Sequence, residues 1–331
     1  MKINNKFSIG THVMFYEIEM FSDFIDGMIN LMETVDNKEN VYIDMAFNVS
    51  QFFENIDTGK VSKIDLTNAF ESQINRLFPH VNSSTLSCRI VDDDSNFYTQ
   101  TDYRREYNSK FCKLVDFVMW GETDSFFPRQ TFQALDVLAD YTRSVNINRF
   151  VACFSDRKMW DSSWDATVHP NYIDHKFIES DHENKNQAKS TMSIAEMNDI
   201  NDNAGKLELI HINYPKIDGS CLVMSSDFLR SGINIPPCFI HNDDESLSLI
   251  AKQMMGDNYY QFIFKNLLKV HARRHPKKRM YILDENNPNG FCNEKKGKWW
   301  SKFITMSQHN IGILIKNQGK FLTFEDFKNN V

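Results

Sequence analysis

The chain has 331 residues, of which 41% are hydrophobic, and its formal net charge is -7. This length and composition exclude a disordered chain and suit one large α/β domain, or such a domain with a smaller appendage. No stretch approaches the roughly 20 apolar residues that a membrane-spanning helix needs, and Met1 to Gly10 carry Lys and Asn in place of an apolar segment. We therefore expect a cytoplasmic protein with no membrane partner.

The six cysteines and the charges narrow the expectation further. The cysteines are scattered and include no Cys-x-x-Cys pair, which argues against a zinc ribbon and a disulfide framework. Eleven basic residues lie between Lys265 and Lys302 against three acidic ones, a net +8, so the rest of the chain carries -15. Because Lys and Arg make most phosphate contacts, this region indicates either a polyanionic partner or a solvated basic face.

Strand and helix patterns alternate through the first half of the chain. The apolar run His12–Ile18 predicts a strand, and the apolar spacing from Phe21 to Met32 predicts an amphipathic helix. The patterns that follow are a strand at Val41–Phe47, a helix striped by Leu66, Phe70, Ile74 and Leu77, a strand at Leu86–Val91, a polar segment at Tyr103–Lys110, a strand at Leu114–Trp120, and a helix striped by Phe132, Leu135 and Leu138. This order predicts a mostly parallel, twisted sheet covered on both faces, with ligands at the carboxyl ends of its strands.

The second half is less regular. Asp174 to Gly205 is polar and predicts a long mobile insertion. The elements predicted after it are a strand at Leu207–Ile212, a turn at Asp218-Gly219-Ser220, a strand at Cys221–Met224, a helix from Ser226, and a helix that opens with Asp243-Asp244-Glu245.

Two carboxylates follow the predicted strand Leu114–Trp120. Glu122 and Asp124 are separated by one residue, and in an extended turn such residues point to the same side. Two hard oxygen ligands so placed could hold Mg²⁺ or Mn²⁺ and leave positions for a diphosphate. The alternative is that Asp124 or Ser125 caps the next helix.

A strand that ends in an acid-x-acid turn, followed by Pro128 and a helix, resembles the DxD region of GT-A fold glycosyltransferases. Other short motifs fall in the order of that family over about residues 10 to 282, with Glu122 in place of the first Asp. The resemblance implies a GT-A-like, Rossmann-type twisted mixed sheet flanked by helices, with a C-terminal acceptor-side extension. It divides the chain into a nucleotide-sugar-binding half (1–150), an acceptor-side half with a polar insertion near 174–205 (151–282), and an extension (283–331).

The same resemblance assigns roles to individual residues. The residues that it implies for the donor nucleotide are Tyr16, Glu17, Asn48, Ser50, Asp102, Arg104, Arg105, Asn108, Glu122 and Thr123. Glu122 and Asp124 would bind Mn²⁺ or Mg²⁺, and His271 lies where a third metal ligand is expected, although a lone His beside a basic run also suits a surface position. A general base would come from Asp243, Asp244 or Glu245 if the reaction inverts the anomeric centre, whereas a retaining reaction needs no such base.

The acceptor side combines aromatic and basic residues. The residues expected there are Trp160, Trp164, Asp218, Lys277, Lys278, Arg279, Trp299 and Trp300. Tryptophans interleaved with Lys are typical of a nucleic-acid platform, but Trp160 and Trp164 also suit a core, and Trp299 and Trp300 could anchor a terminal segment.

The function implied by this resemblance is metal-dependent transfer of a sugar from a nucleoside diphosphate sugar, with UDP the expected nucleotide. The richness in Asn, Lys, Asp and Phe is similar to that of tailed-phage proteins. With the basic region, it points to hydroxymethylated pyrimidines in duplex DNA as the acceptor. The alternatives are transfer to a surface polysaccharide or protein, a carboxylate-metal phosphotransferase or nuclease, and a catalytically silent nucleotide-binding or virion protein. The sequence indicates no oligomeric state.

Overall fold

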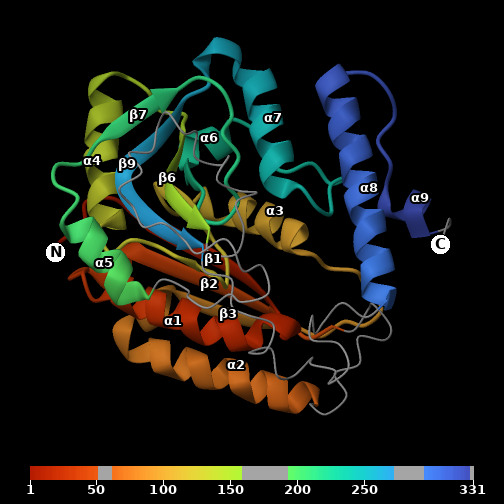
Figure 1. Ribbon diagram of the computed structural model, residues 1–331, viewed down its shortest axis with the longest axis horizontal. Helices are drawn as coiled ribbons and strands as arrows, with labels where there is room; N and C mark the ends of the chain where they lie inside the picture. Colours follow the sequence, from red (N-terminus) through yellow and green to blue (C-terminus); the bar gives the residue numbers. More distant parts are fainter. Residues whose placement is uncertain (51–61, 159–192, 272–293, 329–331) are drawn as a thin grey trace, which may run out of the picture.

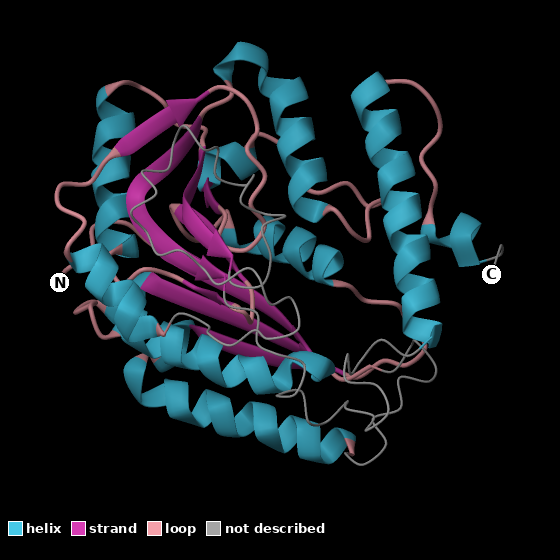
Figure 2. Ribbon diagram, in the orientation of Figure 1, coloured by secondary structure: helices cyan, strands magenta, loops and turns pink. Residues whose placement is uncertain are grey.

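The computed structural model describes residues 1–50, 62–158, 193–271 and 294–328. In these residues nine strands form one sheet, and helices cover both of its faces (Figure 1 and Figure 2). The strands are β1 (Phe7–Met14), β2 (Val41–Asn48), β3 (Leu86–Val91), β4 (Phe117–Gly121), β5 (Ser125–Phe126), β6 (Val151–Lys158), β7 (Leu209–Ile212), β8 (Val223–Ser225) and β9 (Gln261–His271). The α-helices are α1 (Ile18–Met32), α2 (Lys63–Leu77), α3 (Gln100–Phe111), α4 (Thr131–Ser144), α5 (Ile194–Asp202), α6 (Ser226–Arg230), α7 (Asp243–Met255), α8 (Glu294–Lys316) and α9 (Phe324–Lys328).

The sheet has the order β3-β2-β1-β4-β8-β6-β9-β5, and β7 pairs with β9. β3, β2, β1 and β4 are parallel to one another. β8 runs antiparallel to β4 and β6, and β5 and β7 run antiparallel to β9. The predicted helix-flanked α/β sheet is confirmed, and it is mixed as the family resemblance implied. The expectation of a mostly parallel sheet holds only for the first half.

The strand order indicates where a ligand is expected to bind. From β1 the chain builds outward through β2 to β3, and it then returns to place β4 on the other side of β1. In open α/β sheets, the carboxyl edge at such a reversal is where the connecting loops diverge and ligands bind. The segments after β1 and β4 therefore flank the expected site.

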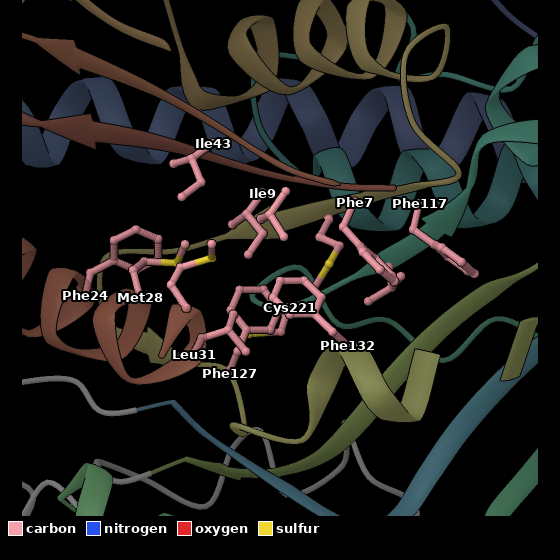
Figure 3. Packing of buried hydrophobic residues seen from close by; sticks show 14 of the residues in the cluster. Phe7, Ile9, Phe24, Met28, Leu31, Ile43, Phe117, Phe127, Phe132 and Cys221 are labelled. Atoms are coloured by element: carbon pink, nitrogen blue, oxygen red, sulfur yellow. The ribbon is translucent and has the colours of Figure 1, made fainter. Parts of the chain in front are cut away.

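One face of the sheet carries the larger apolar core (Figure 3). Phe7 and Ile9 of β1 pack there with Phe24 and Met28 of α1 and with Phe132 of α4. The alternation of a strand sends every second β1 side chain to this face. This packing holds the parallel strands against α1 and α4.

The other face holds α3, α6, α7 and part of α8. The α3 side chain Tyr107 lies so close to β1 that a Cβ atom at Gly10 would come within 2.5 Å of its ring. The Tyr107 hydroxyl donates a hydrogen bond to Ser8 at 2.8 Å. Small residues in β1 thus bring α3, which carries Arg104, close to the sheet.

The first predicted strand has different bounds in the structure, and some observed elements were not predicted. The first strand begins at Phe7 and ends at Met14, short of the predicted Ile18, because Phe15–Glu17 forms a 3-10 helix that leads directly into α1. The predicted insertion contains α5, whose Met197 is completely buried. β6 and β9 were not predicted. Within the described residues, none of the helices combines the length and apolar character needed to cross a bilayer.

Candidate active site

The acid turn lies at the carboxyl end of β4. The backbone N–H of Ser125 donates to the carbonyl of Glu122 at 3.0 Å, which closes a tight turn with Thr123 and Asp124 at its centre. The argument from an extended turn, in which the two carboxylates share one side, therefore does not apply. The alternative of a helix cap is also wrong, because β5 follows directly and α4 begins only at Thr131.

Arg104 of α3 joins this turn to two distant segments. Its Nη2 donates to Glu122 Oε1 at 2.9 Å and to the carbonyl of Gly219 at 2.7 Å, and its Nη1 donates to Asp243 Oδ2 at 2.6 Å. The side chain is only 3% exposed, and the guanidinium lies over the Trp120 ring, 4.4 Å from its centroid. Burial works to lower the pKa of Arg104, but the charges of Asp243 and Glu122 outweigh it and raise the pKa above its ordinary value.

Asp244 is the residue next to Asp243 at the start of α7. Its Oδ1 accepts a hydrogen bond from the backbone N–H of Glu245 at 2.8 Å, and its Oδ2 lies 2.8 Å from the position that a Cβ atom would take at Gly219. Burial, together with the negative charge of Asp243, raises the pKa of Asp244 to about 7. A carboxyl group with such a pKa can exchange a proton near neutral pH.

The third predicted acid has a local role. Asn242 donates its side-chain amide to Glu245 Oε2 at 2.7 Å, and the backbone of Asn242 is left-handed, with φ 57°. The three candidate bases are thus distinguished by their contacts: Asp243 binds Arg104, Glu245 binds Asn242, and Asp244 packs on Gly219.

Polar groups also lie where β1 and β2 end. Asn48 donates to the carbonyl of Tyr98 at 3.0 Å and accepts from the backbone N–H of Ser50, whose hydroxyl donates to the carbonyl of Asp93 at 2.8 Å. Asn48 also lies 3.5 Å from His12 Nε2. These contacts tie the ends of β1 and β2 to the loop that follows β3.

His12 was not singled out from the sequence. Burial lowers its pKa to about 3, and the positive charges of Arg104 and Arg89 add to the effect. The imidazole is therefore neutral at physiological pH, and within the described residues its Nδ1 is buried without a hydrogen-bond partner. The only available signal was the position of His12 in an apolar strand, and this position did not distinguish His12 from other buried strand residues.

Several residues predicted to contact the donor are bound within the protein. Arg105 donates to the carbonyls of Ile235, Pro236 and Phe239. Asn108 is completely buried and accepts from Trp120 Nε1 at 2.8 Å. Donor contacts by Arg105 or Asn108 would require these bonds to break.

Two of the remaining donor residues, Asp102 and Glu17, have local contacts. Asp102 completes the capping box of α3 by accepting from the backbone N–H of the N-cap residue Thr99, and it also binds Arg105 at 2.7 Å. Glu17 accepts a hydrogen bond from the backbone N–H of Met14 at 3.2 Å. Thr123 is buried, and the side chain of Tyr16 lies outside the description. Their donor contacts stay predictions.

The predicted metal ligands can be compared with this geometry. Glu122 Oε1 accepts from both Arg104 and Gln100, so a metal ion there would have to replace these donors. Asp124 is half-buried on the turn, and the backbone of His271 pairs with Ser125, the next residue. The side chain of His271 lies outside the description, and the described residues contain no cluster of three or more potential ligand side chains. The strand pairing brings the backbone of His271 beside the residue that follows Asp124, and metal binding by Asp124, His271 or Glu122 stays a prediction.

Asp218, predicted to bind the acceptor, belongs to a buried ion pair. Lys269 Nζ donates to Asp218 Oδ1 at 2.5 Å and also to the hydroxyl of Ser220, and the Lys269 side chain has no exposed surface. Lys269 was counted in the basic region from Lys265 to Lys302. The expectation that Lys269 could bind a polyanionic partner is wrong, because a fully buried ammonium cannot reach a phosphate backbone. Lys265 is also paired, with Glu208 at 3.0 Å.

Most other acceptor residues cannot be placed. Those that lie outside the described residues are Trp160, Trp164, Lys277, Lys278 and Arg279. Trp299 and Trp300 lie in α8, but the structure does not describe their side chains. Their predicted roles stay predictions.

Comparisons with known proteins yield only distant likenesses. No protein-family model matches the chain, and no curated protein matches it significantly. Among solved structures, residues 1–349 of TarS from S. aureus are 10% identical with a TM-score of 0.37, over 86% of this chain and 68% of that one.

Two further structures are similar at the same level. A putative nucleotide-diphospho-sugar transferase from Desulfovibrio desulfuricans G20 is 9% identical, with a TM-score of 0.34 over 78% of this chain and 79% of that one. A UDP-glucose pyrophosphorylase complexed with UDP-glucose is 7% identical, with a TM-score of 0.35 over 90% of this chain and 99% of that one. At such low similarity, these likenesses carry no functional argument.

Proposed function

We propose that the protein is a glycosyltransferase that moves a sugar from a nucleoside diphosphate sugar to a hydroxyl group. The observation that carries the proposal is the convergence of the acid turn after β4 with the acids that open α7. They meet at the carboxyl edge where the parallel strands reverse their order, and one of the acids, Asp244, has a pKa of about 7. The order of the sequence motifs supports the same class.

The chemistry assigned to Asp244 is general base catalysis. Its carboxylate takes the proton of the acceptor hydroxyl while the hydroxyl oxygen bonds to the anomeric carbon of the donor sugar. The bond between that carbon and the diphosphate oxygen breaks, and the nucleoside diphosphate departs with the bonding electrons. Attack opposite the leaving group inverts the anomeric centre, so the proposal favours an inverting reaction.

Donor binding is assigned to the ends of β1, β2 and β4. The nucleotide would lie against the segment that contains His12, Asn48 and Ser50, where buried polar groups already hold the loop after β3. Asp124 and His271 would hold Mn²⁺ or Mg²⁺, which when bound stabilises the charge on a departing diphosphate. Glu122 would join them only by exchanging Arg104 and Gln100 for the metal.

The acceptor is proposed from the charge of one region of the chain. Duplex DNA with hydroxymethylated pyrimidines is the proposed acceptor because of the basic residues between Arg273 and Lys302. The burial of Lys269 removes one charge from that argument. A polysaccharide or protein acceptor would leave the assignment of the donor site unchanged.

A panel of nucleotide sugars tests the class directly. The protein is incubated with UDP-, GDP- and TDP-sugars and Mn²⁺ or Mg²⁺, with and without modified duplex DNA or a glycan, and released nucleoside diphosphate is measured. Release from at least one donor, increased by an acceptor, is expected. No release from any donor would exclude the proposed class and favour phosphoryl chemistry or a silent binding protein.

A further inference from the structure

The buried network around Arg104 points to a role that differs from the contact with the donor nucleotide that the family resemblance implies. We propose that Arg104 is a positioning residue, which holds the first turn of α7, and with it Asp244, at a fixed place relative to the acid turn after β4. The inference rests on the proposed function, because it concerns the placement of the group assigned as base.

The three bonds of Arg104 reach three segments that are far apart in sequence. Glu122 follows β4, Gly219 precedes β8, and Asp243 opens α7. Nη1 serves α7, whereas Nη2 serves the other two segments. Because a guanidinium is planar and its nitrogens keep fixed directions, these bonds constrain the orientation of the segments as well as their separation.

Two of the three bonds end on the immediate surroundings of Asp244. Asp243 is its neighbour in the chain, and Gly219 is the residue on which its Oδ2 packs. A shift of either contact would move the Asp244 carboxylate. Within the described residues, the side-chain hydrogen bonds of Arg104 go to Glu122, Gly219 and Asp243 and not to Asp244, so its effect on the base is indirect.

The charges explain why a cation is needed at this place. Glu122 and Asp243 come within hydrogen-bond distance of one guanidinium, and Asp244 adds a third acid beside them. Without Arg104, the two half-buried carboxylates would face each other with no compensating cation and would separate. The stacking of the guanidinium on Trp120 further limits its movement.

A phosphate ligand would require a different arrangement. With its side chain 3% exposed and its bonds to Glu122, Asp243 and Gly219 in place, Arg104 would have to leave this network to meet a diphosphate. The two roles respond differently to lysine. Lysine can replace arginine as a point charge toward phosphate, but one ammonium cannot reproduce the directed bonds to three segments.

The test compares Arg104→Lys with the wild type, using the donor that the panel identifies and UDP as the binding probe. We expect kcat to fall by about 100-fold, since a misplacement of about 1 Å can have an effect of this size. The donor KM and the Kd of UDP, measured by calorimetry, should change by less than about twofold. Arg76→Lys is the matched control: Arg76 of α2 forms an exposed ion pair with Asp26 of α1, and its substitution should change none of these values.

The opposite pattern would overturn the inference. Retained kcat with a tenfold or larger rise in the donor KM and the Kd of UDP would make Arg104 a phosphate ligand. Absence of wild-type turnover with every donor would end the proposed function and the inference together, whereas an active wild type with an unaltered Arg104→Lys would overturn the inference alone.

Unfolding measurements test whether Arg104 and Asp243 are energetically coupled. Arg104→Met, Asp243→Asn and the double variant form a double-mutant cycle for the free energy of unfolding in urea. A positioning bond predicts that the effects of the two substitutions are not additive. Additive effects would show that the two side chains are not coupled, and would also overturn the inference.

Discussion

The turn after β4 and the first turn of α7 each carry neighbouring carboxylates, but the fold gives them different partners. In the β4 turn, Glu122 is bound by Arg104 and Gln100. At α7, Asp243 shares the same arginine, while Asp244 packs against Gly219 and has its pKa raised by burial. Neighbouring acids in a sequence therefore need not share one role. At α7, Arg104 binds Asp243, whereas Asp244 has the raised pKa that allows it to exchange a proton near neutral pH.

The largest effect should come from the member that can exchange a proton. Asp244→Asn keeps the size of the side chain but removes the base, and we expect kcat to fall by about 10² to 10⁴-fold. Asp227→Asn, at an exposed ion pair with Arg230, is the control and should be close to wild type. If Asp243→Asn or Glu245→Gln lowers kcat more than Asp244→Asn does, the assignment within this turn is wrong.

The β4 turn should respond through the metal. Asp124→Ala removes a proposed ligand from a half-buried turn, so turnover should fall by about 100-fold or more while the melting temperature changes little. A titration of the variant with Mn²⁺ should show a raised metal requirement. Activity that persists in the variant at the usual metal concentration, or in EDTA-treated wild type, would remove Asp124 from the site.

The raised pKa of Asp244 predicts the pH dependence of activity. Because a base must be deprotonated, kcat/KM should rise with pH and level off above about 7. The acid limb should be measured under conditions where chemistry, and not product release, limits the rate. A limb with its midpoint near the ordinary Asp value of 3.8 would contradict the environment described for this side chain.

The same group affects stability with a defined sign. The folded state holds the Asp244 proton more tightly than the unfolded state does, so the free energy of unfolding should decrease as pH rises from about 4 toward 7. In Asp244→Asn this contribution disappears, and the variant should therefore gain stability relative to wild type between about pH 5 and about pH 8. Urea unfolding of both proteins at the two pH values checks this. A constant difference would argue against the raised pKa.

The smallest of these effects should come from the contact between the turn before β8 and α7. In Gly219→Ala the new Cβ would lie 2.8 Å from Asp244 Oδ2, so the carboxylate must move. We expect roughly a tenfold loss of kcat with a smaller change in the donor KM. Gly312→Ala in α8 is the control, because no atom lies within 4 Å of the added Cβ. Wild-type kcat in Gly219→Ala would show that this contact does not matter.

The sequence predicted the local elements more successfully than the contacts between them. β3 has the predicted bounds, and α7 begins at the predicted acid, because their apolar spacing and helix-start residues lie within a few positions of one another. β9 was missed since Lys265, Asn266 and Lys269 interrupt its apolar residues. An apolar run on both sides of Lys269 was the available signal for its burial.

The candidate site could be predicted only in part. The acids after β4 and at α7 were identified by type, and the carboxyl edge was identified by the alternation of strands and helices. The bond from Arg104 to Asp243 joins residues 139 positions apart, and no local pattern encodes it. The raised pKa of Asp244 likewise depends on its burial in the folded chain and on the charge of Asp243, and the topology brings distant residues such as Gly219 against it.

The release of nucleoside diphosphate from the donor panel, measured for wild type and Asp244→Asn side by side, tests the central claim most directly. The proposed function predicts that the wild type turns over at least one nucleotide sugar in the presence of an acceptor. It also predicts that Asp244→Asn binds UDP with unchanged affinity but turns over at least about 100-fold more slowly. Wild-type protein that releases no nucleoside diphosphate from any donor, or a variant as active as wild type, would contradict it.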